Sequence, residues 1–317
     1  MITERIAAGL GLPIQFILNL SSSASHRYKT YKVRKKHGGF RTIHHPSRRL
    51  KAVQIWILRN ILVSLPVHDA AAAYRQEKSV LDNAKVHAGG RFLLRLDLTD
   101  FFPSITADDF VRYVRASPIY FEGWSEQDIQ CVSALLFRKG RLTIGAPTSP
   151  ALSNALCFEI DLAIKAMSAS KEIRYTRYAD DLFFSSDAPN VLQSVSAEVE
   201  SLLQQASIPK GLQLNKAKTI HSSKKRNRQV TGIVLGSDGK PHVPRAYKRV
   251  IRSMIHRFAG LSDQEKASLA GMISYVVGHE PNFTNSLIKK YGFAVFTTVT
   301  ELKTLEERQR LRAARKA

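Results

Sequence analysis

Cysteine is nearly absent from the sequence: Cys131 and Cys157 are the only two in 317 residues. Two thiols are too few for a disulfide framework or a structural zinc site, and both lie in apolar, helix-like surroundings. We therefore expect buried thiols in a cytoplasmic protein.

No run of 18 or more apolar residues occurs, which argues against a membrane-spanning helix and a membrane partner. Glu4 and Pro13 interrupt the apolar stretch at residues 1–20, so we predict an amphipathic helix there rather than a signal peptide.

Acidic residues are also scarce. The chain has 26 Asp and Glu against 48 Lys and Arg, which gives a net charge of +22. The excess is concentrated, because residues 26–51 hold ten Lys or Arg and no acid, and residues 206–257 hold thirteen with Asp238 as the single acid. One-signed blocks of this kind favour a polyanionic partner, and nucleic acid is the first choice. An anionic membrane surface is the rival, but no basic amphipathic helix dominates.

The most informative acids stand together at Tyr178-Ala-Asp180-Asp181, between two aromatic-rich runs. The pattern predicts a β-hairpin over residues 173–186 with both carboxylates at its tip. An isolated Asp-Asp is more often a polar turn, but about 0.02 chance matches to Tyr-x-Asp-Asp are expected in this composition. Asp97 ends a separate apolar, strand-like run and supplies a third carboxylate. Carboxylates brought together suit Mg²⁺, which is held by one or two of them plus substrate phosphates.

Three motifs in chain order resemble the polymerase motifs of reverse transcriptases: Asp97-Leu-Thr-Asp-Phe-Phe-Pro, Gly145-Ala-Pro-Thr-Ser-Pro150 and Tyr178-Ala-Asp-Asp181. Asn83-Ala-Lys-Val-His87 and Val230-Thr-Gly232 resemble two signatures of bacterial retron reverse transcriptases. The resemblance runs from about Arg41 to about Gly236. It implies an α+β, right-hand polymerase fold. The implied parts are fingers at residues 1–90 and 107–143, a ferredoxin-like palm at 91–106 and 144–238, and a basic helical thumb at 239–317.

The resemblance also implies a function. Retron enzymes are RNA-directed DNA polymerases that copy part of a structured noncoding RNA into single-stranded DNA that stays linked to RNA. The implied cofactors are two Mg²⁺ ions with deoxynucleoside triphosphates as substrates. The implied partners are the RNA template-primer and its DNA product, with an effector protein and a host RNase H as further partners in antiphage defence.

Site residues follow from the same resemblance. Asp97, Asp180 and Asp181 are the expected catalytic and metal-binding residues, and Phe102 is the expected steric gate against ribonucleotides. The expected nucleotide contacts are Arg41, Lys51, Gly145, Ala146 and Lys218, with Arg48 and Arg49 as alternatives for the phosphates and Lys218 as a proton donor to pyrophosphate. The expected RNA contacts are Asn83, His87, Val230, Thr231, Gly232, Lys224, Lys225, Arg226, Arg228, Arg245, Lys248 and Arg249.

Two of these assignments remain open. Taken alone, His87 is more often a hydrogen-bonded structural residue than a ligand contact. Ile144 stands where the family commonly has Gln, so recognition of the nucleotide sugar need not follow the familiar pattern.

Local patterns predict further elements. Residues 52–65 and 189–206 are expected to be helices, and Gly145–Pro150 should open one long helix to about Ser170. A strand with a basic turn is expected over Leu212–Thr219. These elements give the order β-α-β-β-α-β of a ferredoxin-like palm, whose edge the strand at Val230–Leu235 would join. Thr106 with Asp109, and Ser125 with Asp128, should cap helices. Helices separated by Gly260, Gly278 and Gly292 should follow from residue 244.

Two other functions compete with the retron assignment. One is another compact bacterial reverse transcriptase of the group II intron or diversity-generating type. Only about eighty residues follow the palm, which argues against an intron protein with further domains. The other is a catalytically silent RNA-binding scaffold, which the presence of all three aspartates argues against.

Overall fold

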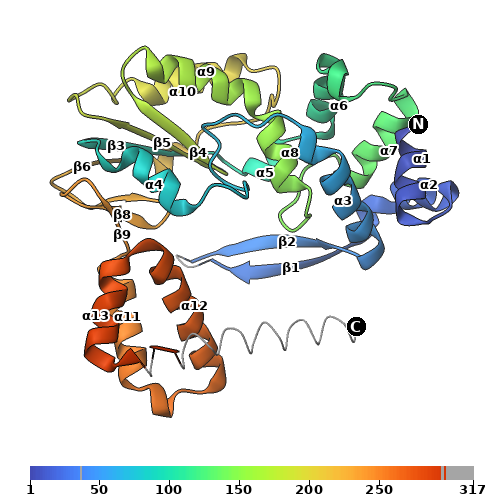
Figure 1. Ribbon diagram of the computed structural model, residues 1–317. Helices are drawn as coiled ribbons and strands as arrows, with labels where there is room; N and C mark the ends of the chain where they lie inside the picture. The colour runs from blue at the N-terminus through green and yellow to red at the C-terminus, as the bar shows by residue number, and fades with distance from the viewer. Residues whose placement is uncertain (36–37, 294–295, 298–317) are drawn as a thin grey trace. The chain divides into compact units, whose positions relative to one another are not determined.

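The computed structural model describes residues 1–35, 38–293 and 296–297, and the chain divides into two compact units (Figure 1). The first unit contains residues 1–79 and 90–223, and the second contains residues 80–89 and the chain from Lys224 onward. This division differs from the predicted domain boundaries at two segments, 80–89 and 224–238, because both pack within the second unit. The names fingers, palm and thumb stay predictions for the ranges given above.

A four-stranded antiparallel sheet organises the first unit. Its strands are β3 (Phe92–Asp97), β4 (Arg174–Tyr178), β5 (Asp181–Ser186) and β6 (Ile220–Ser223), in the spatial order β4-β5-β3-β6. Helices between β3 and β4, and α10 (Val195–Gln205) between β5 and β6, complete the order β-α-β-β-α-β. The predicted ferredoxin-like palm and the α+β class are confirmed.

The two faces of this sheet differ in chemistry. Alternate residues of a strand point to opposite faces, and directly paired residues share a face. Leu94, Leu96, Leu182 and Phe184 share one face and belong to the core of the unit. In Figure 1, α9 (Phe158–Ala169) and α10 lie side by side over this sheet. The opposite face carries Arg95, Asp97 and Asp181.

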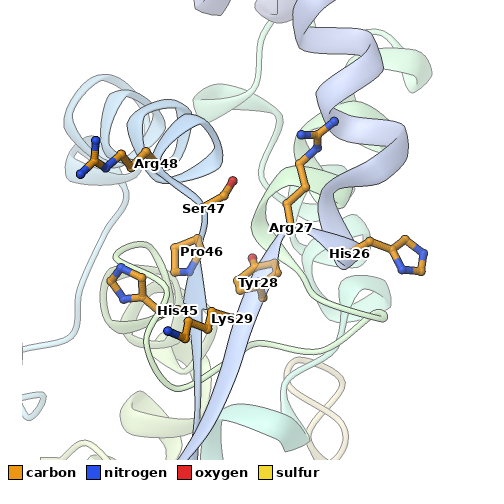
Figure 2. A pocket seen from close by; sticks show the side chains of 8 residues that line it. All are labelled: His26, Arg27, Tyr28, Lys29, His45, Pro46, Ser47 and Arg48. Atoms are coloured by element: carbon orange, nitrogen blue, oxygen red, sulfur yellow. The ribbon is translucent and has the colours of Figure 1, made fainter.

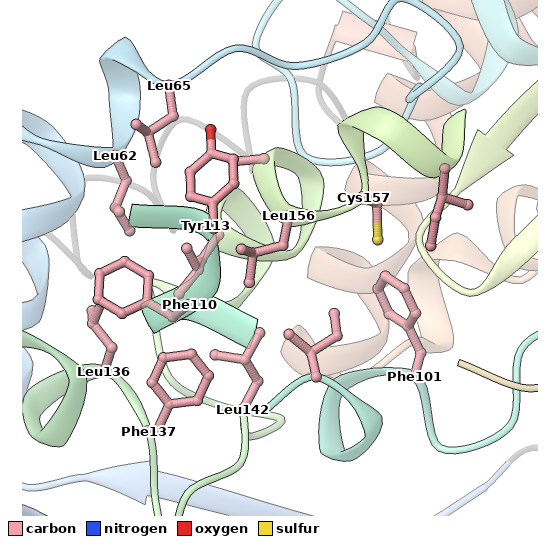
Figure 3. Close-up of a cluster of buried hydrophobic side chains, with 14 of the residues drawn as sticks. Leu62, Leu65, Phe101, Phe110, Tyr113, Leu136, Phe137, Leu142, Leu156 and Cys157 are labelled. Atoms are coloured by element: carbon pink, nitrogen blue, oxygen red, sulfur yellow. The ribbon is translucent and has the colours of Figure 1, made fainter. Parts of the chain in front are cut away.

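A helical core fills the rest of the first unit. Figure 3 shows part of it, where Phe110, Phe137 and Leu142 pack together. The remaining elements of this region are α1 (Ile2–Leu10), α2 (Ile14–Ser23), η1 (Ala24–His26), α3 (Arg48–Asn60), η2 (Leu62–Ser64), α5 (Phe101–Ser104), α6 (Ala107–Ala116), η3 (Pro118–Tyr120), α7 (Glu126–Leu136) and α8 (Ser149–Leu156). Cys131 and Cys157 are buried free thiols in this core, as predicted.

The N-terminal stretch forms two helices rather than one. Gly11 ends α1 in the left-handed conformation, with φ of 63°. Within the described residues no single helix is long and apolar enough to cross a membrane; α1 with the segment Ile14–His26, bent by 108°, meets the length and composition test only as a pair. Ile6 and Ile17 from this pair are fully buried in the core.

The acid-free segment, residues 26–51, contains a basic hairpin. Strands β1 (Tyr28–Arg34) and β2 (Phe40–Pro46) pair antiparallel, with Val33 opposite Arg41 and Tyr31 opposite Ile43. Gly38 and Gly39 have φ of 90° and 73°, values that favour glycine in the connection. The backbone N–H of His44 donates to the carbonyl of Ile144 at 2.8 Å, which attaches β2 to the Gly145 motif.

The second unit joins a small sheet to a helical bundle. Its sheet comprises β7 (Arg228–Val230), β8 (Ile233–Leu235) and β9 (Pro241–His242), and α4 (Val80–Ala88) packs against all three strands. The bundle comprises α11 (Arg245–His256), η5 (Phe258–Gly260), α12 (Asp263–His279) and α13 (Pro281–Tyr291). Residues 298–317 of the predicted thumb lie outside the described residues.

Several local predictions are confirmed and four are wrong. Thr106 with Asp109 and Ser125 with Asp128 form capping boxes. The long helix after Pro150 is instead α8 and α9, separated at Cys157. The strand predicted at Leu212–Thr219 begins at Ile220, because a 3-10 turn, η4 (Lys216–Lys218), interrupts the pairing with β3. Residues 230–235 do not extend the palm sheet, because they turn back as the hairpin β7-β8. Helix α12 also continues through Gly278 to His279.

Candidate active site

The three predicted carboxylates meet at one end of the palm sheet. Asp97 ends β3 and is paired in register with Asp181, the first residue of β5. Ala179 and Asp180 form the two-residue turn between β4 and β5, and Ala179 has a φ of 56°. The Leu98 N–H donates to the Asp180 carbonyl at 2.9 Å, so the turn is attached to the strand that carries Asp97. Two segments more than eighty residues apart thus place their acids side by side.

Burial and neighbouring carboxylates raise the pKa values of Asp180 and Asp181. Burial raises the pKa of Asp180, and the charge of Asp97 raises it further. Burial is also the largest cause at Asp181, where the neighbouring charges of Asp180 and Asp97 help raise the pKa to about 6 against the lowering effect of Arg95. Burial and like charge both disfavour the ionised form. A positive charge beside these two carboxylates would favour their ionised forms.

Two basic side chains contact the acids. Lys218 Nζ lies 2.9 Å from Oδ1 and 3.1 Å from Oδ2 of Asp97. Turn η4 places Lys218 there, because the Asn215 N–H donates to the Asp97 carbonyl at 2.7 Å and the chain then loops over the strand end. Arg95 contacts Asp181, with Nε and Nη2 at 3.0 and 2.8 Å from Oδ1. Arg95 was not predicted, although its position two residues before Asp97 on the same strand face was a usable signal.

The carboxylates of Asp97, Asp180 and Asp181 are chemically suited to bind a hard divalent cation. All three groups are carboxylates, the ligand type that Mg²⁺ prefers, and Asp97 and Asp181 are directly paired in the sheet. Among residues 1–35, 38–293 and 296–297, no group of three or more His, Cys, Asp and Glu side chains already converges on a common metal position. Lys218 forms an ion pair with Asp97, and Arg95 forms one with Asp181, so a bound cation would share these carboxylate oxygens or displace the two basic side chains.

Arg41 and Lys51, two of the predicted phosphate contacts, lie in different elements. The positive charge of Arg41 on β2 opposes the rise in the pKa of Asp180, so the Arg41 side chain acts on the carboxylate turn. Lys51 lies in the first turn of α3, where its N–H donates to the Ser47 carbonyl at 2.8 Å. A contact of Lys51 with a triphosphate stays a prediction.

Glycine is required at position 145. Gly145 has a φ of 115°, and a Cβ there would lie 2.7 Å from the carbonyl oxygen of His44. Glycine at this position therefore allows the close approach of β2 of the basic hairpin. Ala146 is buried beside it. Nucleotide contacts by Gly145 and Ala146 stay predictions.

The predicted gate residue has an aromatic neighbour. Phe102 lies in α5, five residues after Asp97, and its ring centroid is 5.3 Å from that of Phe101. Tyr74 approaches from a distant segment, with 6.3 Å between its ring centroid and that of Phe102. Burial raises the pKa of Tyr74, and the charge of Asp180 adds to that effect. Tyr74 was not singled out from the sequence, which has no local pattern that connects it to Phe102.

The two retron-like signatures meet within the second unit. Thr231, with φ of 49°, and Gly232, with φ of 84°, form the turn between β7 and β8. The hydroxyl of Thr231 donates to the carbonyl of Val80 in α4 at 3.3 Å, which joins the two signatures. Asn83 and His87 on that helix are 1% and 0% exposed. Their burial favours a structural role for these two side chains, and RNA contacts by them stay predictions.

The predicted basic RNA contacts differ in exposure. Arg228 is fully buried, and its Nη2 donates to the carbonyls of Leu235 and Gly236 at 3.4 and 3.0 Å. Lys248 pairs with Glu280 and is half-buried. The exposed basic side chains are Lys224, Lys225, Arg226, Arg245 and Arg249. Arg245, Arg249 and Arg252 repeat at helical spacing on α11, so they form one basic stripe along a helix face.

A hollow of about 520 Å³ lies at the base of the basic hairpin. It is lined by His26, Arg27, Tyr28, Lys29, His45, Pro46, Ser47 and Arg48. Figure 2 shows the guanidinium groups of Arg27 and Arg48 pointing away from each other. The hollow is therefore part of a broad basic surface rather than a convergent anion clamp.

Comparison with known proteins agrees with these features. Residues 33–235 match the reverse transcriptase (RNA-dependent DNA polymerase) family. The chain is 33% identical over 291 residues to the retron Ec83 reverse transcriptase of Escherichia coli, covering 90% of this chain and 93% of that protein. It is 31% identical to the retron Ec86 reverse transcriptase of Escherichia coli, covering 89% and 88%. The retron Mx162 reverse transcriptase of Myxococcus xanthus is 31% identical, with 88% of this chain and 64% of that protein covered.

Proposed function

The chain belongs to the reverse transcriptase family and, within it, to the retron reverse transcriptases, and from this we propose that it copies part of a structured noncoding RNA into single-stranded DNA that remains linked to RNA. Membership makes it an RNA-directed DNA polymerase, and this family uses a divalent metal ion and deoxynucleoside triphosphates. One observation carries the proposal: Asp97 on β3 is paired directly with Asp181 on β5, next to the β4-β5 turn that contains Asp180.

Strand extension is an in-line attack of a 3′-hydroxyl on the α-phosphate of the incoming nucleotide. Charge develops on the attacking and leaving oxygens, and two Mg²⁺ ions, when bound, stabilise that charge. We assign Asp97 and Asp180 as their principal ligands and Asp181 as a weaker third. Lys218 is the proposed proton donor to the departing pyrophosphate, since its ammonium group already lies at Asp97 and its side chain is more than half exposed.

Arg41 and Phe102 would bind the nucleotide itself. The charge of Arg41 acts at Asp180, which suits contact with a triphosphate held at the same carboxylate. Phe102 would occupy the space of a ribose 2′-hydroxyl and so select deoxynucleotides. Both roles rest on these positions together with the family motifs.

The RNA would be held by two kinds of surface. The exposed stripe on α11 and the exposed cluster Lys224–Arg226 suit phosphate contacts, which give affinity without reading sequence. The β7-β8 turn exposes Gly232 and partly exposes Thr231 between these basic segments in the chain. We assign recognition of the cognate RNA to this turn, with α4 as its support.

The biological setting follows from family membership. We propose a role in antiphage defence, in which an effector protein and a host RNase H act with the enzyme and its RNA-linked DNA. The large positive charge of the chain supports a complex with a polyanion of this kind.

Sequencing the nucleic acid that copurifies with the protein tests the proposal. The expected species is a DNA whose mobility shifts after RNase treatment, joined to an RNA whose other part is its template. RNA without attached DNA would instead support a binding scaffold, and a long intron transcript would support an intron-type enzyme. Either of these outcomes would overturn the retron assignment of activity.

A further inference from the structure

Tyr74 is a second aromatic residue at the catalytic turn. Its side chain is 50% exposed, its ring centroid lies 6.3 Å from that of Phe102, and the two ring planes are inclined by 42°. We propose that Tyr74 and Phe102 together form the wall that contacts the sugar of the incoming deoxynucleotide. The proposal rests on the proposed polymerase function and on the gate role of Phe102, and it adds Tyr74 as a specificity-determining residue.

The backbone of Tyr74 is held in a conformation that a bulky residue rarely adopts. Its φ is 62°, in the left-handed region that favours glycine. Such a conformation persists where surrounding contacts determine it, and these positions gather at functional sites. An ordinary surface tyrosine in a loop has no need of it.

The contacts that hold this segment come from the catalytic hairpin. The Arg177 N–H donates to the carbonyl of Ala70 at 2.8 Å, and the Ala72 N–H donates to the carbonyl of Arg177 at 2.8 Å. The side-chain amide of Asn154 donates to the carbonyl of Ala73 at 2.9 Å. Residues 70–73 are all buried, so Tyr74 emerges from a fixed base beside β4.

The Arg177 side chain connects the same segment to the carboxylates and to the gate. It is 1% exposed and forms a bidentate ion pair with the buried Asp161 of α9. Its Nη1 donates to the carbonyl of Ala179 in the carboxylate turn at 3.4 Å, and its guanidinium carbon lies 5.9 Å from the ring centroid of Phe101. One buried residue therefore contacts the segment of Tyr74, the turn of Asp180 and the neighbour of Phe102.

Hydrogen bonds to Arg177 hold the segment of Tyr74 beside the strand that leads into the carboxylate turn. The charges of Asp180 and Arg41 both act on the Tyr74 hydroxyl. A nucleotide whose phosphates lie between Arg41 and Asp180 would present its sugar to the pair of rings. A tyrosine that served only to fill the core would be enclosed, whereas half of the Tyr74 side chain is open to a ligand.

Single-nucleotide insertion on an RNA template, with a deoxynucleotide and the matching ribonucleotide, tests the proposal. We expect Tyr74→Leu to lower the preference for deoxynucleotides in kcat/KM about tenfold, mainly through the KM of the deoxynucleotide. Tyr74→Phe keeps the ring and should stay within about twofold of the wild type. Tyr120→Leu, which alters another half-exposed tyrosine of the same unit, is the matched control and should leave the preference unchanged.

A double variant separates a shared wall from two independent effects. Tyr74→Leu combined with Phe102→Val should change the preference by less than the product of the single changes, because two contacting residues are not additive. If Tyr74→Leu slows both nucleotides equally, Tyr74 has only a structural role and the inference is overturned. If Phe102→Val shifts the preference and Tyr74→Leu does not, the inference fails while the polymerase function stands. A wild-type protein that inserts neither nucleotide would overturn the function as well.

Discussion

The catalytic turn and the helix that carries Asn83 and His87 are both marked by short motifs, but their side chains lie in opposite environments. Around the turn, Asp180 and Asp181 are partly exposed and their pKa values are raised by burial and like charge. On α4, Asn83 and His87 are enclosed against β7-β9. The first motif has the properties of a ligand site, and the second has those of a packed interior. A motif thus identifies a family without saying which of its residues touch the substrate.

The largest effect is expected at the turn. Asp180→Asn keeps the shape of the side chain but removes the charge that would hold a cation, so single-turnover primer extension should fall by about 10³-fold or more. The melting temperature should stay near that of the wild type. Asp108→Asn, which alters an exposed acid in the first turn of α6, is the matched control and should extend primers normally. Normal primer extension by Asp180→Asn would show that the carboxylate turn is no more a ligand site than the buried motif on α4.

The next effect is expected in the second unit. His87→Ala removes a fully buried polar side chain, and this should lower the free energy of unfolding of that unit by about 2–3 kcal/mol. Calorimetry of the full chain, with limited proteolysis to locate the loosened segment, measures it. If the variant keeps its stability but loses RNA binding, then His87 contacts RNA directly.

A third prediction concerns the metal-free protein. The folded-state pKa of Asp181 is raised to about 6 from an ordinary 3.8, so the native state binds more protons than the unfolded state between these values. Stability therefore falls as pH rises through that window, and the whole cost, about 1–3 kcal/mol, is present above it. Asp181→Asn should then raise the melting temperature at pH 8 and have no such effect below about pH 4. Equal melting temperatures at pH 8 would show that Asp181 is not destabilising.

The smallest effect is expected on the basic stripe. Arg249→Ser should weaken RNA binding without changing the melting temperature, because Arg249 is exposed on α11. The slope of log affinity against log salt should become shallower by roughly 0.7–0.9, as for the loss of one phosphate contact. Buried Arg228 gives the opposite expectation, since its replacement should act on stability first. An unchanged salt slope for Arg249→Ser would take this face of α11 out of the RNA interface.

The sequence was sufficient for the palm but not for its surroundings. The apolar run that ends at Asp97 predicted β3, and the aromatic runs around Asp180 and Asp181 predicted the β4-β5 hairpin, because strand-forming residues and turn residues act locally. The strand expected at Leu212 was displaced because η4, which has no apolar pattern, is held by long-range hydrogen bonds to β3. Tyr74 and Arg177 escaped prediction for the same reason, since their importance depends on contacts across the fold. The β7-β8 hairpin was assigned to the wrong sheet because a short apolar run does not specify its partner.

The central claim is that Asp180 binds a metal ion that is needed for DNA synthesis. Single-turnover primer extension by Asp180→Cys, in Mg²⁺ and in Mn²⁺, tests it most directly, because a thiolate binds the softer ion better. We expect almost no extension in Mg²⁺ and partial recovery in Mn²⁺, beyond any effect of Mn²⁺ on the wild type. Extension at the wild-type rate in Mg²⁺ would contradict it.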